Sequence, residues 1–270
     1  MVSDLPQFSS FENTDVFLHK LLLPNWDQPE CMLQLNSGLL LADVANSDFL
    51  NNTRMFLAAL AENGDVPATA TGNLNRKFVR SMFERLKFPQ LFRESILQFS
   101  KALNETDLWQ LHIIRLVSEC AGLVSRRKKH FQITKLGRTL LPDDQAGKLY
   151  QILFITYFQR FDLQYEFQYR DVPGIQQTMT VILWNLHMLA QDWKPVQGLG
   201  PEILLPGVYV QMRSAMMQYD KEDWIISGYI LNPLCKFGLI EIKETNKWPD
   251  ITEKDLIRVT ALWRKFIGLV

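Results

Sequence analysis

Features that mark secreted, membrane-spanning and zinc-binding proteins are scarce in this sequence. Its three cysteines lie far apart and show no CxxC spacing, which disfavours a disulfide framework or a structural zinc site. Asp4 stands where a signal peptide carries basic residues. The longest apolar runs, such as residues 152–158, are too short to span a bilayer. We therefore expect a cytoplasmic protein with no membrane partner.

Catalytic motifs are also missing from the sequence. It contains no Gly-rich phosphate loop, no GxSxG and no HExxH. The four histidines are scattered, and His112 and His187 fall in apolar helical stretches typical of a partly buried, hydrogen-bonded imidazole. Asp143 and Asp144 are more typical of a loop and helix cap than of a carboxylate pair. We expect no cofactor and no metal, and we rank an enzyme below the binding functions, with a site assembled only in three dimensions left open.

The formal net charge is zero, but the charge is unevenly distributed. Apolar residues make up 47% and charged residues 21%, which is ordinary for a globular protein. Residues 1–66 hold nine acidic and two basic side chains, a net −7, whereas residues 67–138 hold fourteen basic and five acidic ones, a net +9. The basic middle favours a polyanionic partner. The equally weighted alternative is that the acidic N-terminal segment packs against it and neutralises it.

Three segments open with threonine in a similar way. They are "TATGNLNRKFV" from Thr69, "TKLGRTLL" from Thr134 and "TALWRKFIGLV" from Thr260. In each, Gly or Trp follows three residues later, and an apolar-rich helical stretch comes next. The separations of 65 and 126 residues predict a repeated unit of about 65 residues, with the copy near position 197 degenerate or replaced.

The second of these segments has the most complete context. Apolar residues recur at helical spacing within residues 107–121, and Gly122 is a typical helix end. A strand, a polar turn and a second strand follow, and Thr134 is placed to cap the next helix through its hydroxyl. The third segment shows the same order after a helix that ends near Gly238. In the first, the hairpin is short or absent, because Pro67 cannot donate to a ladder.

The order helix, strand, turn, strand and Thr-headed helix resembles the back half of bacterial winged helix-turn-helix proteins. "GLV…FQITKLGRTLL" is similar to the recognition-helix exit, the wing and the following helix of that family. The resemblance covers residues 105–141 well, 222–267 moderately and 48–80 weakly. "ATATGNLNRKFV" is also similar to a tandem winged-helix-like region of some uncharacterised bacterial proteins. The resemblance implies a fold but no function, because the same unit also serves in protein docking.

We predict a mainly α-helical fold with small β-hairpins, built from tandem winged-helix-like units. The expected parts are an acidic N-terminal segment (1–45), unit 1 with a degenerate wing (46–95), unit 2 (96–148), an aromatic-rich helical connector (149–200) and unit 3 (201–270). In the connector, Phe154, Tyr157, Phe158 and Phe161 share one helix face, which favours a core-facing stripe over a base-stacking surface. The Pro/Gly-rich stretch 194–207 predicts a linker at a domain boundary.

Basic residues cluster at two places that could contact a polyanion. The predicted turn of unit 2 and its flank carry Arg126, Arg127, Lys128, Lys129, Lys135 and Arg138. A second cluster at helical spacing consists of Arg76, Lys77 and Arg80. The helix before the turn offers Gln110, His112, Arg115, Ser118 and Glu119, which is a poor set for reading base edges because only one is a fixed cation. For both clusters, a merely solvated surface is the competing interpretation.

Two functions follow from these patterns. The leading hypothesis is a non-enzymatic protein that contacts nucleic-acid phosphates, possible partners including DNA, through the wing at 126–130 and the helix face at 76–80. Such contacts would give salt-sensitive, sequence-independent affinity. The alternative is a protein–protein interaction scaffold that uses the same units without nucleic acid. The sequence leaves oligomeric state, target sequence and partner identity open.

Overall fold

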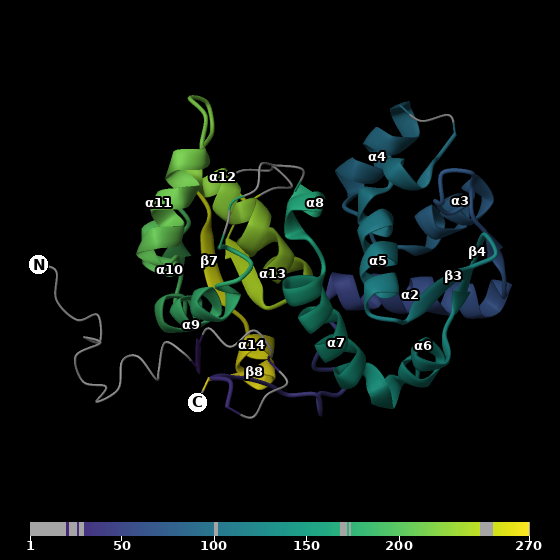
Figure 1. The fold of residues 1–270 in the computed structure, drawn as a ribbon, viewed down its shortest axis with the longest axis horizontal. Helices are drawn as coiled ribbons and strands as arrows, with labels where there is room; N and C mark the ends of the chain where they lie inside the picture. The colour runs from purple at the N-terminus through teal and green to yellow at the C-terminus, as the bar shows by residue number, and fades with distance from the viewer. Residues whose placement is uncertain are drawn as a thin grey trace, which may run out of the picture.

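The protein is mainly α-helical with small antiparallel sheets, as the sequence predicted (Figure 1). The structure is a computed structural model that describes residues 20–21, 26, 30–99, 102–167, 172, 174–243 and 251–269. Strand β1 (Leu33–Leu35) pairs with β8 (Ile267–Leu269), and one continuous hydrophobic core runs through both halves. Within the described residues, no helix is both long and apolar enough to cross a membrane.

In the first half, helices pack around a three-stranded sheet. Its elements, hereafter the first repeat (residues 48–140), are α2 (Asp48–Asn63), β2 (Val66–Pro67), α3 (Arg76–Arg85), α4 (Gln90–Phe99), η2 (Glu105–Asp107), α5 (Trp109–Cys120), β3 (Val124–Arg127), β4 (His130–Ile133) and α6 (Lys135–Leu140). Strand β4 pairs with β3 on one side and with β2 on the other, so the order is β2–β4–β3. Strand β2 thereby joins the segment predicted as unit 1 to the segment predicted as unit 2.

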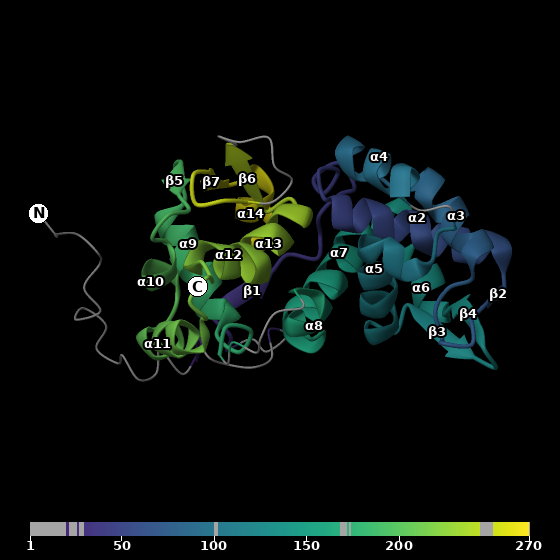
Figure 2. The ribbon, with the colours of Figure 1, turned by 90° about the horizontal axis from the view of Figure 1, so that it is seen from above.

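The second half has the same arrangement. Its elements, hereafter the second repeat (residues 179–266), are α9 (Met179–Leu189), β5 (Lys194–Pro195), α10 (Gly200–Ile203), α11 (Pro206–Ala215), α12 (Glu222–Ile226), the π-helix η5 (Ser227–Leu231), α13 (Asn232–Lys236), β6 (Ile240–Lys243), β7 (Leu256–Val259) and α14 (Ala261–Phe266). The sheet order is β5–β7–β6, which corresponds strand by strand to β2–β4–β3. Figure 2 shows the two repeats side by side.

The hydrogen bonds at the corner after each hairpin are the same in the two repeats. Gly122 and Gly238 end the preceding helices with φ of 71° and 74°. Thr134 donates its hydroxyl to the Gly122 carbonyl at 2.8 Å, and Thr260 donates to the Gly238 carbonyl at 2.8 Å. Each hydroxyl also accepts from the amide three residues on, which caps the next helix. The prediction that Thr134 and Thr260 head equivalent helices is confirmed.

Thr69 does not occupy a third corner of this kind. Its amide donates to the Asn73 carbonyl at 2.7 Å, and its hydroxyl accepts from the Asn73 amide, so it closes a turn between β2 and α3. Helix α3 is capped by Asn75 instead. The prediction of a unit of about 65 residues was therefore wrong, because one sheet joins β2, at residues 66–67, to β3 and β4, at residues 124–133.

The connector between the repeats consists of η3 (Asp143–Gln145), α7 (Ala146–Ile155), the π-helix η4 (Thr156–Arg160) and α8 (Leu163–Phe167). Phe154, Tyr157, Phe158 and Phe161 are buried, so the predicted core-facing stripe is confirmed. Helix α8 lies between α5 of the first repeat and α12 and α13 of the second in both views (Figures 1 and 2).

The Pro/Gly-rich stretch 194–207 is part of the second repeat rather than a linker. It begins with β5, and Val196 and Leu199 are fully buried. Pro201 and Pro206 stand in the first turns of α10 and α11, where a missing amide hydrogen costs no helical bond. The prediction of a linker was wrong because these prolines begin helices instead of separating domains.

Candidate nucleic-acid interface

The hairpin of strands β3 and β4 closes with the shortest common turn. Arg127 pairs with His130, so only Lys128 and Lys129 form the loop. Their φ angles are 47° and 62°, and among the described residues no other non-glycine residue has a positive φ. A two-residue turn with both φ positive usually carries Asn-Gly, because a β-carbon is strained there. Two like charges are therefore held at a strained tip that a neutral pair would form more easily.

The side chains at this tip are exposed and carry uncompensated positive charge. Arg126, Arg127, Lys128 and Lys129 are all exposed, and none forms an ion pair with a described residue. Arg126 is the most constrained, since its Nη1 donates to the Gly72 carbonyl at 3.0 Å. The remaining three project from the turn. The structure thus places the predicted wing residues together on one hairpin, in solvent.

The loop between β2 and α3 brings the second basic cluster to the hairpin. The Ala68 amide donates to the Lys129 carbonyl at 2.7 Å, and Gly72, with φ of 82°, gives Arg126 room to approach. Helix α3 begins directly after this loop. Its first residues, Arg76 and Lys77, are exposed and follow on from the hairpin-bound loop.

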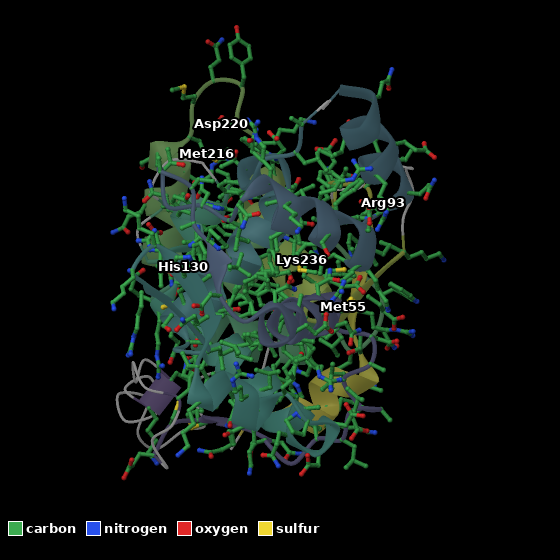
Figure 3. All side chains as sticks on the ribbon, turned by 90° about the vertical axis from the view of Figure 1, so that its right-hand side faces the viewer. Met55, Arg93, His130, Met216, Asp220 and Lys236 are labelled. Carbon is green, nitrogen blue, oxygen red and sulfur yellow. The ribbon has the colours of Figure 1, made fainter. Side chains whose placement is uncertain are left out.

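The basic residues of the predicted site that lie outside the hairpin differ in whether another side chain pairs with them. Arg80 is exposed but forms an ion pair with Glu84 at 3.2 Å one helical turn on, which reduces its charge toward a ligand. Arg76 donates from Nε to the side-chain oxygen of Asn104 at 2.9 Å. Lys135 and Arg138 are exposed on α6, at the base of the hairpin, and have no ion pair with a described residue. Figure 3 views this end of the molecule, with His130 on the hairpin.

The described part of the acidic N-terminal segment does not cover the hairpin tip. Asp43 pairs with Lys265 of the second repeat, and Glu62 pairs with Arg85. Asp65 accepts a hydrogen bond from Gln132, and this contact lies on β4 and not at the turn. Of the other six acidic residues, Glu30 and Asp48 are described and form no ion pair with a described residue, whereas Asp4, Glu12, Asp15 and Asp27 lie outside the described residues.

Helix α5 turns most of its polar side chains inward. His112, Arg115 and Ser118 are buried, at 4%, 4% and 0% exposure. The helix was predicted to be a poor reader of base edges, and burial of these three side chains removes them from any groove-facing surface, since α5 packs against α2, β3 and the connector. His112 and Arg115 share one partner, Glu105, which sequence reasoning missed. The i, i+7, i+10 spacing of Glu105, His112 and Arg115 was the signal that could have found it.

Glu105 is a buried carboxylate with a full set of partners. Its Oε1 lies 2.6 Å from both Arg115 Nε and His112 Nδ1, and its other oxygen accepts from the Leu74 amide. Burial by itself acts to raise the pKa of this carboxyl, but the His112 hydrogen bond and the Arg115 charge outweigh burial and lower the pKa below its ordinary value. The network therefore fixes the loop that carries Leu74 with an ionised group.

A pocket of about 530 Å³ lies in the other half of the molecule, in the second repeat. Its lining combines Tyr219, Trp224 and Ile251 with the charged side chains Lys221, Asp223 and Glu253. Lys221 and Glu253 form an ion pair at 3.4 Å. Within the described part of the chain, no group of three or more His, Cys, Asp or Glu side chains is placed to hold a metal ion.

Comparison with known proteins finds a likeness over the first repeat. Residues 45–148 match the Y4jL N-terminal domain family, and this match spans both segments predicted as units 1 and 2. The uncharacterised protein y4jL of Sinorhizobium fredii (strain NBRC 101917 / NGR234) is 34% identical over 83 residues, or 31% of this chain. The chain covers 38% of the length of that relative. No solved structure gives a significant match.

Proposed function

We propose that the first repeat binds nucleic acid, DNA in particular, by contacting phosphates with the hairpin of β3 and β4 and with the start of α3. The main support for this proposal is the turn formed by Lys128 and Lys129. Its strained backbone holds the two lysines in solvent beside Arg127, and neither lysine forms an ion pair with a described residue. Strain of this kind persists where a local conformation has a use. A cytoplasmic location, with the free cysteines Cys31, Cys120 and Cys235 reduced, fits this proposal.

The order of elements supports an interpretation of each repeat as a winged-helix-like unit. A long helix leads to a short strand, further helices follow, and a hairpin then pairs back with that strand. In this interpretation the hairpin is the wing. Because α5 buries His112 and Arg115, the contact would involve phosphates and hairpin side chains instead of base edges read by that helix.

A salt series tests the proposal. Binding of a labelled mixed-sequence duplex, and of its single strand, is measured by fluorescence anisotropy between about 50 and 200 mM salt. The affinity of the wild type should fall linearly on a log–log plot. A variant with Arg127, Lys128 and Lys129 replaced by Ala should lose most of its affinity and reduce the slope by about 3.

The matched control replaces Lys243 and Lys254, two exposed lysines of the second repeat that form no ion pair with a described residue. This control should bind as the wild type does. Salt-independent behaviour of the wild type, or equal binding by the hairpin variant, would contradict the proposal.

The second repeat favours a second candidate, a protein-interaction scaffold. Its loop from Met217 to Asp220 projects from the body, as Figures 1 and 3 show, with Met216 and Asp220 at its ends. Tyr219 is 90% exposed there and Met217 53%. Exposed aromatic and Met side chains are enriched at protein interfaces. If this is the whole function, the wild type should bind neither the duplex nor the single strand. Affinity capture should then recover a protein partner that a Tyr219→Ser variant fails to retain.

A further inference from the structure

Helix α8 packs one aromatic side chain against each repeat. Tyr165 stacks on Trp109 with ring centroids 5.7 Å apart, and Phe167 packs on Trp224 at 5.2 Å. Trp109 and Trp224 each stand at the beginning of the long helix that precedes the hairpin of their repeat. The first turn of this helix in each repeat is therefore contacted by a ring from one five-residue helix, and the two rings stand two positions apart in the sequence.

Both contacts are closely fitted. The Tyr165 hydroxyl lies 2.8 Å from His112 Nε2 in the first repeat. In the second repeat, Gly228 leaves the space that the Phe167 ring fills, because a β-carbon on Gly228 would lie 1.9 Å from that ring. Tyr229 adds a ring contact to Phe167 at 5.0 Å.

Glu166, between these two aromatic residues, holds the helix in place. Its carboxylate accepts from the Tyr157 hydroxyl and pairs with Lys236 Nζ at 2.7 Å, and its carbonyl accepts from Trp109 Nε1 at 3.2 Å. Lys236 belongs to the second repeat and Trp109 to the first. Helix α8 is thus bonded to both repeats through one residue as well as through its two rings.

From Tyr165, a chain of hydrogen bonds leads through the buried His112 and Glu105 to the basic surface. His112 Nε2 contacts Tyr165, His112 Nδ1 contacts Glu105 at 2.6 Å, and Glu105 accepts from the Leu74 amide. Leu74 ends the loop whose Gly72 carbonyl holds Arg126. When the imidazole donates from Nδ1 to the carboxylate, its Nε2 accepts from the tyrosine hydroxyl, so the three groups align one another.

We propose that α8 couples the position of the second repeat to the conformation of the loop of residues 68–75 in the first repeat. Tyr165 and Phe167 are the positioning residues. With α8 in place, Glu105 is aligned on Leu74 and the loop is fixed beside Arg126. With α8 displaced, the loop opens. Its link to nucleic-acid affinity rests on the proposed function, whereas the coupling itself does not.

Hydrogen exchange on the full chain without nucleic acid tests this inference. In Tyr165→Ala, exchange of the Leu74 amide should rise about tenfold, the size of one weakened hydrogen bond. Tyr165→Phe keeps the ring and loses only the hydroxyl, so it should give a smaller rise. Amides of α2, which report global opening, should be unchanged, as should all amides in the control Leu136→Ala, an exposed side chain on α6.

Phe167→Ala distinguishes coupling between the two repeats from a local effect of the Tyr165 contact within the first repeat. The ring contacts of Phe167 lie in the second repeat, so increased exchange at Leu74 in this variant is the signature of coupling. An unchanged Leu74 amide in Phe167→Ala, or an equal rise across α2 in Tyr165→Ala, would overturn the inference.

Duplex binding measured on the same variants distinguishes the proposed coupling from the proposed nucleic-acid binding. Tyr165→Ala should weaken duplex binding severalfold by releasing the loop. Because the exchange assay contains no nucleic acid, a wild type that binds no duplex would overturn the proposed function and leave the exchange result standing.

Discussion

The two repeats share a topology and a corner hydrogen-bond pattern, yet their basic residues are placed differently. In the second repeat, Lys194 pairs with Glu202 and Arg258 pairs with Glu241 across the strands of the hairpin. In the first repeat, the hairpin basic residues have no acidic partner among the described residues. The two copies therefore share the glycine and threonine corners but differ in the acidic partners of their hairpin strands.

The cores of the two repeats also differ in their charged residues. The first repeat buries Arg115 with Glu105 at 2.6 Å, whereas residue 231, at the corresponding place before the helix end, is a fully buried leucine. A buried ion pair is not needed to stabilise such a helix, because apolar packing serves as well. Among the described residues, such a fully buried pair occurs in the first repeat and not in the second, which fits a positioning role for Glu105 beside the basic loop.

The largest expected effect on stability comes from removing the ion pair between Glu105 and Arg115. Arg115→Leu copies the second repeat but leaves Glu105 buried without its main counter-charge, so the free energy of unfolding should fall by about 3–5 kcal/mol. Urea denaturation measures it. The matched control Leu231→Met should cost less than about 1.5 kcal/mol. Equal losses in the two variants would show that Arg115 only fills space.

A second variant tests the corner itself. A β-carbon on Gly137 would lie 2.4 Å from the Leu123 carbonyl oxygen and 2.8 Å from the Ile133 side chain. Gly137→Ala should therefore destabilise the protein by about 1–3 kcal/mol, measured by thermal or urea unfolding. The neighbouring Leu136→Ala, at a side chain that is 43% exposed, should cost far less. A neutral Gly137→Ala would mean that the corner tolerates a shift.

The strained turn provides a gain of stability. Replacing Lys128 with Asn and Lys129 with Gly supplies the preferred residues for two positive φ angles, and should stabilise the protein by about 1 kcal/mol. It also removes two charges while keeping the hairpin, so the salt slope of duplex binding should fall by about 2. Increased stability with unchanged binding would show that the tip does not contact phosphate.

The smallest expected effect is on the acid dependence of stability. Because the folded state lowers the Glu105 pKa, the ionised form contributes stability above its ordinary value of 4.5, and this contribution is lost as the pH falls through the lower folded value. Denaturation at several pH values should show that Glu105→Gln loses less stability on acidification than the wild type does. A steeper loss in the variant would contradict this assignment.

Local patterns in the sequence were sufficient for the hairpin of the first repeat. The helix before Gly122, the two strands and the Thr134 cap follow from periodicity and turn chemistry, and the aromatic stripe follows from helical spacing. Each of these depends on residues close in sequence. The basic side chains at the hairpin tip were found for the same reason, since Arg126, Arg127, Lys128 and Lys129 are consecutive in the sequence.

The long-range features could not be read in this way. Strand β2 has only two residues, too few for a periodic signal, and Pro67 weighed against it, although a proline is tolerated on an edge strand. Its place is set by pairing with β4, far along the chain. The role of Glu105 and the insertion of α8 also depend on contacts between distant segments. The Glu105 contacts form within the first repeat, whereas the contacts of α8 form where the two repeats meet.

Hydrogen exchange on the wild type, with and without a mixed-sequence duplex at low salt, tests the difference between the repeats most directly. Protection is expected at residues 124–133 and in the loop and helix start at 69–77, with no change at 240–243 and 256–259. Protection confined to the second repeat, or none anywhere at a duplex concentration that saturates binding, would contradict this expectation.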